Sequence, residues 1–106
     1  MRGDIYSVAG SGYTSKPRPA VIVQSNETDF FDSVIICLFT IDTSIGGPTR
    51  VSMQANRTNG LTKDCILMAD KVIAVKRSSL RTKIGTLSDE DMMRVDAALK
   101  IILGLT

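Results

Sequence analysis

The sequence contains no histidine and no tryptophan, and these absences narrow the chemistry that it can support. Without an imidazole, cleavage of a phosphodiester by paired histidines and every Ser/His or Cys/His triad are excluded. The two cysteines, Cys37 and Cys65, lie far apart in apolar runs, where a reduced thiol packs as a small hydrophobic side chain. Such a pair does not make a structural zinc site, and no nucleotide-binding glycine motif is present. The sequence therefore predicts neither a metal nor a cofactor.

Long hydrophobic runs are also absent. No stretch approaches the roughly 20 apolar residues of a membrane-spanning helix, and the opening MRGDIYS lacks the apolar segment of a signal peptide. The net charge of +2 permits an anionic partner without requiring one. We expect a cytoplasmic protein that does not enter a membrane.

What is present is the composition of one folded domain, with 106 residues, 43% of them hydrophobic and 23% charged. Short β-branched runs separated by turn-rich loops predict a mostly β fold, a small barrel or sandwich. The expected strands are 4–9, 19–24, 33–41, 48–53, 64–68 and 71–75, with loops at 10–17, 42–47 and 54–63. Phe30 and Phe31, between two of these strands, are predicted to cover a sheet edge as part of the core rather than to stack on bases.

The end of the chain predicts a helix. Ser88 followed by Asp91 resembles a capping box, and acidic residues suit the positive end of a helix. An apolar stripe recurs at helical spacing, and Gly104 is placed as a stop signal. The stripe consists of Met92, Val95, Ala98, Leu99, Ile102 and Leu103. We expect it to pack on the sheet or on a second copy of the chain.

The segment Lys16-Pro17-Arg18-Pro19 holds a cation between two prolines, where a flexible loop enters a buried strand. A guanidinium offers several donors in a planar fork, which suits it to grip a phosphate and stabilise charge growing there. The alternative is that Arg18 is a solvated charge at the sheet edge. A second junction, Pro48-Thr49-Arg50, places the Thr49 hydroxyl where it could hold a phosphate, although threonine is common in strands for steric reasons.

Several of these segments together resemble the MazF/PemK family of bacterial toxins, in order along the whole chain. They are Arg2-Gly3-Asp4-Ile5-Tyr6, Lys16 to Val23 (KPRPAVIV), Pro48 to Val51 (PTRV), Gly85 to Ser88 (GTLS) and Gly104-Leu105. The resemblance implies a single toxin domain over 1–106 with an SH3-like small barrel of the MazF/CcdB type. It also implies a homodimer inhibited by a cognate antitoxin protein.

The activity that the resemblance implies is metal-independent, sequence-specific cleavage of single-stranded RNA, which inhibits translation and growth. The 2′-hydroxyl beside the cut attacks the phosphate, leaving a 2′,3′-cyclic phosphate and a 5′-hydroxyl. The family's catalytic arginine corresponds to Arg18, which would stabilise the phosphorane, and its threonine to Thr49, which would position the phosphate. Because arginine is a poor base at neutral pH, the group that accepts the proton stays open.

RNA binding is predicted mainly for the first loop, where an aromatic side chain can stack on a base and the backbone can bend around a strand. The predicted RNA-binding residues are Tyr13, Thr14, Ser15, Lys16 and Arg50. Many relatives carry an arginine and an aspartate in the strand after the middle loop, but residues 70–76 read DKVIAVK, so no acid or base role is carried over to that strand.

An alternative function comes from another class, because the same barrel serves non-catalytic toxins that bind a protein such as DNA gyrase. Those relatives rely on a tryptophan near the C-terminus, which this chain lacks. The sequence thus favours the ribonuclease.

Overall fold

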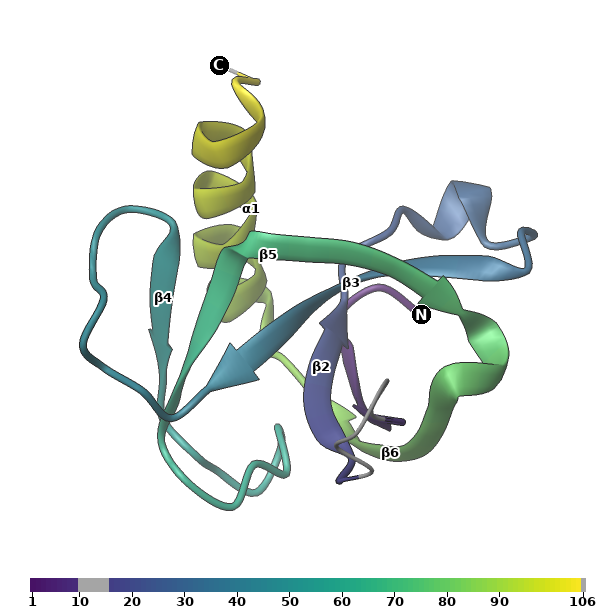
Figure 1. Ribbon diagram of the computed structural model, residues 1–106, viewed down its shortest axis with the longest axis horizontal. Helices are drawn as coiled ribbons and strands as arrows, with labels where there is room; N and C mark the ends of the chain where they lie inside the picture. The colour runs from purple at the N-terminus through teal and green to yellow at the C-terminus, as the bar shows by residue number, and fades with distance from the viewer. Residues whose placement is uncertain (10–15, 106) are drawn as a thin grey trace.

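The computed structural model describes residues 1–9 and 16–105 and contains one antiparallel sheet and one long helix (Figure 1). The strands are β1 (Asp4–Val8), β2 (Arg18–Ile22), β3 (Ser33–Thr40), β4 (Arg50–Met53), β5 (Cys65–Lys76) and β6 (Leu80–Thr86). The helices are the short η1 (Asn26–Thr28) and η2 (Arg77–Ser79) and the C-terminal α1 (Asp89–Leu103). The predicted mostly β class with a C-terminal helix is confirmed. No helix in the described part is long and apolar enough to cross a membrane.

The strands follow one another in the order β4-β5-β3-β2-β1-β6, and a break in register bends the sheet. Cys37 of β3 pairs with Val72 of β5, and Phe39 pairs with Leu67. The segment of β5 between these two pairs is therefore longer than the facing segment of β3. Such an irregularity bends the longer strand and increases its twist. β5 accordingly curves around the molecule (Figure 1), which gives the open sheet its barrel-like shape.

The loop between β4 and β5 closes the gap between the two edges of the sheet. The amide of Thr86 in β6 donates to the carbonyl oxygen of Thr58 at 3.0 Å. Two glycines allow this approach: a Cβ on Gly60 would lie 2.2 Å from the Ile84 carbonyl oxygen, and one on Gly85 would lie 2.5 Å from the main chain of Asn59. Any side chain at either position would push the loop away from β6.

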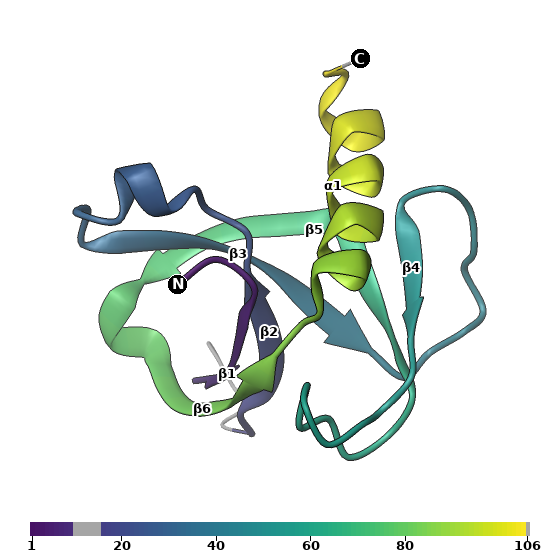
Figure 2. The same cartoon turned by 180° about the vertical axis from the view of Figure 1, so that it is seen from behind.

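Helix α1 packs on the sheet as far as Ala98 and exposes its last turn. The Ser88 side chain accepts from the Asp91 amide, and Gly104, with φ 71°, ends the helix in the left-handed conformation. Met92, Val95 and Ala98 are buried against β4 and β5. Figure 2 shows the C-terminal turns extending past the sheet, and Ile101, Ile102 and Leu103 there are exposed.

Three expectations differ from the structure. The strands predicted at 64–68 and 71–75 form one bent strand, β5, because the irregularity does not break it. The structure has a further strand, β6, whose mostly polar and half-exposed residues gave no alternating signal. The prediction for Phe30 and Phe31 was wrong, since they are 73% and 53% exposed and pack on each other at a centroid distance of 4.5 Å.

Candidate active site

Arg18 and Thr40 lie at neighbouring ends of β2 and β3, because these two strands are antiparallel partners. Ala20 pairs with Leu38, so continuing this register by two residues places Arg18, the first residue of β2, opposite Thr40, the last residue of β3. Directly opposed residues of an antiparallel pair lie on the same face of the sheet. The start of β2 and the end of β3 therefore place a guanidinium and a hydroxyl at the same end of two central strands.

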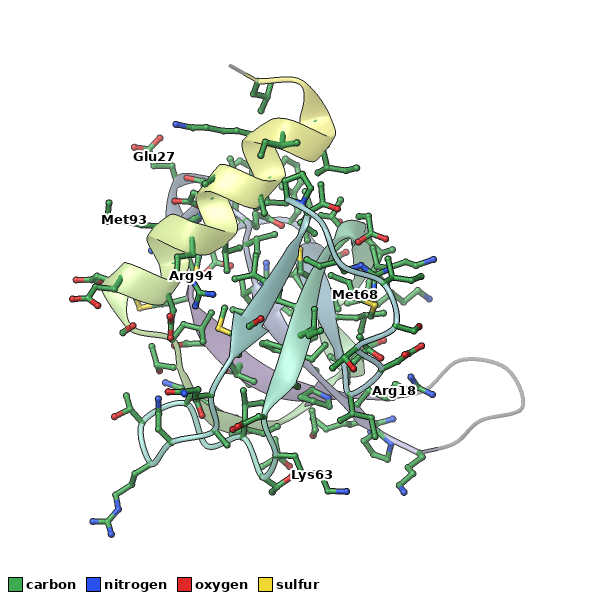
Figure 3. All side chains as sticks on the ribbon, turned by 90° about the vertical axis from the view of Figure 1, so that its left-hand side faces the viewer. Arg18, Glu27, Lys63, Met68, Met93 and Arg94 are labelled. Carbon is green, nitrogen blue, oxygen red and sulfur yellow. The ribbon has the colours of Figure 1, made fainter. Side chains whose placement is uncertain are left out.

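Both side chains line a cavity of about 480 Å³. This volume falls within the roughly 300–1,000 Å³ of small-molecule sites. Apolar residues form much of its surface, among them Pro17, Phe39, Ile41, Leu61 and Ile84. One wall is the segment Gly60–Lys63 from the β4–β5 loop. Figure 3 shows Arg18 and Lys63 at the end of the molecule away from α1.

The cavity carries positive charge without a matching acid. Lys16, Arg18 and Lys63 line it, and the described lining residues include no carboxylate. Within residues 1–9 and 16–105, none of these three cations forms a salt bridge, although Arg2, Arg50, Arg77, Lys83 and Arg94 do. Unpaired cations around a hollow attract an anionic ligand, and a phosphate suits a guanidinium especially well.

The Thr40 hydroxyl accepts one hydrogen bond from the turn that follows β3. Its oxygen accepts from the amide of Asp42 at 3.1 Å, and the Asp42 carboxylate accepts from the amide of Ser44 at 2.9 Å. Hydrogen bonds from Ser44 lower the pKa of Asp42; burial opposes them, and the charge of Arg50 lowers the pKa further. Since the hydroxyl oxygen accepts from the protein, its own proton is available to donate to a ligand.

The structure does not place Thr49 in this cavity. Thr49 precedes β4, its carbonyl oxygen accepts from the Ala69 amide at 3.0 Å, and β3 and β5 lie between β4 and β2 in the sheet. Thr49 is half-buried and is not among the residues that line the hollow. Its catalytic role stays a prediction, but the geometry gives the position beside Arg18 to Thr40.

Arg50 is engaged within the protein. Its Nε and Nη2 donate to the two carboxylate oxygens of Asp70 at 2.8 and 2.9 Å, and its side chain is 9% exposed. The hydrogen bonds from Arg50 hold the pKa of Asp70 below its usual value, although burial opposes them. RNA binding by Arg50 is therefore a prediction that the observed pairing does not support.

The two cysteines are buried free thiols. Cys65 lines the cavity, but burial, assisted by the charge of Asp64, raises its pKa to about 11. Burial, with the charge of Asp70, raises the pKa of Cys37 to about 12. Both thiols stay protonated at neutral pH and are poor nucleophiles. The described residues include no cluster of three or more metal-ligating side chains.

Sequence reasoning found Arg18 and Lys16 in the cavity and missed Thr40, Thr62 and Lys63. Tyr13, Thr14 and Ser15 lie outside the described residues. A signal for Thr40 was available: two consecutive antiparallel strands place the start of the first beside the end of the second. No comparable pattern pointed to Thr62 and Lys63, because they belong to the β4–β5 loop and reach the cavity only when that loop folds against β6.

Residues 1–103 match the family described as PemK-like, MazF-like toxin of type II toxin-antitoxin system. A probable endoribonuclease MazF from Mycolicibacterium smegmatis is 41% identical over 105 residues, covering 98% of this chain and 96% of the relative. An endoribonuclease MazF from Staphylococcus epidermidis is 28% identical over 110 residues, covering 98% and 91%.

The fold is similar to that of solved structures. An endoribonuclease from a mycobacterial species, in complex with its cognate antitoxin, superposes with a TM-score of 0.84 at 26% identity, covering 100% of this chain and 96% of that one. The Mycobacterium tuberculosis toxin MazF-mt6 has a TM-score of 0.81 at 21% identity, covering 97% and 98%, and thereby shows the shared fold.

Proposed function

The chain belongs to the PemK-like, MazF-like toxins of type II toxin-antitoxin systems, and we propose that it cuts single-stranded RNA in the cavity beside Arg18 and Thr40. As a member of this family it is an endoribonuclease toxin, so the proposal concerns its chemistry, its catalytic residues and its partners. The observation that carries the proposal is that Arg18, which forms no salt bridge within residues 1–9 and 16–105, and Thr40 line the same hollow, whose described lining has no carboxylate.

In the proposed reaction the nucleophile comes from the substrate. The 2′-oxygen of the ribose forms a bond to the adjacent phosphorus and loses its proton, while the bond from phosphorus to the 5′-oxygen breaks and that oxygen gains a proton. The products are a 2′,3′-cyclic phosphate and a 5′-hydroxyl. RNA is thereby required and DNA excluded, because only ribose carries the attacking group.

Arg18 and Thr40 would stabilise the charge that gathers on the non-bridging phosphate oxygens. The guanidinium donates charge-assisted hydrogen bonds, and the Thr40 hydroxyl adds one more, since its oxygen is oriented by the Asp42 amide. Neither group is a base at neutral pH, so both roles are electrostatic. Because the attacking hydroxyl belongs to RNA and Arg18 supplies positive charge, we propose that no metal ion is needed.

The proposal includes two protein partners. A cognate antitoxin would inhibit the enzyme, as the mycobacterial relative was solved with its own antitoxin. A homodimer would cover apolar side chains on α1, where Ile101, Ile102 and Leu103 are exposed. A cytoplasmic location stays a prediction.

The proposal is tested by incubating the purified protein with a long single-stranded RNA in EDTA and mapping the new ends. Wild type is expected to give discrete cuts with 5′-hydroxyl and cyclic phosphate ends. Arg18→Ala should reduce the cleavage rate by about 10²–10³-fold, the usual effect of removing one oxyanion donor. Thr40→Val should reduce it by about 10–100-fold through the loss of one charged hydrogen bond.

Thr49→Val is the matched comparison, because it tests the position that the sequence predicts for the threonine. We expect it to keep cleavage within about threefold of wild type, since Thr49 is not among the residues that line the cavity. A large loss in Thr49→Val with an active Thr40→Val would return the role to Thr49. Absence of cleavage by folded wild type on diverse RNA would refute the ribonuclease and favour the toxin that binds a protein.

A further inference from the structure

The wall of the cavity formed by Gly60–Lys63 is held in one conformation by the buried side chain of Asn59. Asn59 is 1% exposed, yet all its polar atoms are used. Its Oδ1 accepts from the amides of Asn56 and Leu61, both at 3.0 Å, and its Nδ2 donates to the Gln54 carbonyl oxygen at 2.8 Å. The loop therefore keeps its shape without a ligand.

The backbone of this wall is also pressed against the opposite sheet edge. The Cβ positions of Gly60 and Gly85 fall within 2.2–2.5 Å of main-chain atoms of Ile84 and Asn59, so the two backbones are in direct contact. A wall fixed on both sides holds its side chains in place before a ligand arrives, which is what discrimination between similar ligands requires.

Thr62 is the neutral polar side chain that this wall offers to a ligand. The amide of Gly60 donates to the Asn56 carbonyl oxygen, and the amide of Leu61 donates to Asn59. Neither amide is then available for a ligand. Thr62 is exposed at the hollow and, among the described residues, its hydroxyl makes no hydrogen bond to protein. Lys63, beside it, adds a charge that a phosphate satisfies.

We propose that this part of the cavity is a subsite for the nucleobase next to the cut phosphate, and that Thr62 determines which base is accepted. The inference rests on the proposed ribonuclease function. A base has apolar faces and a polar edge, and single-stranded RNA is recognised through unstacked bases read at that edge. Phe39, Leu61 and Ile84 supply the apolar surface, while the Thr62 hydroxyl meets the edge.

The test compares Thr62→Val with Thr58→Val on a pool of RNA randomised around the cut. The two residues lie in the same loop and both are exposed, but Thr58 does not line the cavity. Valine keeps the shape of threonine and removes only the hydroxyl. For Thr62→Val we expect cleavage to continue with unchanged ends, and the ratio of kcat/KM between the preferred base and the others to fall about tenfold at one position.

Lys63→Met separates base recognition from phosphate binding. It should weaken binding equally for all sequences and reduce the slope of log affinity against log salt by about 0.7, the value for one contact to a single strand. The subsite is refuted if Thr62→Val behaves as Thr58→Val, or if it slows all sequences equally, as a phosphate contact would.

A second arm keeps the subsite testable if the protein does not cleave RNA. Binding is measured for oligonucleotides that have a 2′-deoxyribose at the cut and each of the four bases beside it. A base preference that wild type and Thr58→Val share and Thr62→Val loses supports the subsite even without cleavage. Equal affinity for all four bases in wild type refutes it. Failure of the proposed ribonuclease function would be seen in a separate measurement, the cleavage assay, in which RNA with ribose at every position would stay intact.

Discussion

Arg18 and Arg50 each follow a proline-containing loop and open a strand, but their surroundings give them different roles. Arg18 lines the cavity and forms no salt bridge with any described residue. Arg50, in contrast, donates two hydrogen bonds to the carboxylate of Asp70. Arg50 is 9% exposed and Arg18 lies on the surface. An arginine whose charge is already balanced stabilises the protein, and one whose charge is unbalanced can bind an anion.

The comparison predicts opposite consequences for Arg18→Met and Arg50→Met. Arg18→Met should reduce RNA cleavage by about 10²–10³-fold and change the free energy of unfolding by at most about 0.5 kcal/mol. Arg50→Met should destabilise the protein by about 1 kcal/mol, because Asp70 loses its hydrogen-bonding partner while solvent still reaches its carboxylate. Cleavage assays and urea unfolding of both variants measure this. Equal effects of the two variants on both properties would contradict the distinction.

The wall beside the cavity is supported by backbone contact rather than by an ion pair, so it should be sensitive to a single methyl group. Gly60→Ala places a Cβ 2.2 Å from a carbonyl oxygen and forces a residue with a side chain to adopt φ 69°. We expect a loss of about 2–4 kcal/mol in the free energy of unfolding.

Gly46→Ala is the control for this loss, because nothing lies within 4 Å of its Cβ position. Urea unfolding should place Gly46→Ala within about 0.5 kcal/mol of wild type. If both alanine variants are equally stable, the close contact between the loop and β6 does not hold the wall.

The smallest expected effect is the pH dependence of the Arg50–Asp70 pair. Hydrogen bonds from Arg50 hold the pKa of Asp70 below the usual aspartate value of 3.8, so the contribution of Asp70 to stability is present above that value and is lost as the pH falls through the lower folded pKa. Asp70 is 27% exposed, and solvent limits the contribution to about 1 kcal/mol or less.

Unfolding of wild type and Asp70→Asn at pH 7 and pH 3 measures this contribution. The difference in stability between the two should be largest at pH 7 and should shrink at pH 3. Asp4 and Asp42 also have lowered pKa values, so they change the stability of both proteins with pH. Their contribution cancels when the stability of Asp70→Asn is subtracted from that of wild type. A difference that does not change with pH would show that the charge of Asp70 is not what stabilises it.

By itself the sequence determined the fold class, the position of most strands and both ends of α1, and it singled out Arg18 as a candidate that lines the cavity. These features depend on neighbouring residues: β-branched runs favour strands, Ser88 and Gly104 cap a helix, and two prolines surround one cation. Only the tertiary structure decided which threonine lines the cavity with Arg18, which arginine is paired with Asp70, and that Thr62 and Lys63 reach the cavity. Those outcomes depend on strand register, on the bend in β5 and on a loop crossing to β6, which bring together residues that no local pattern connects.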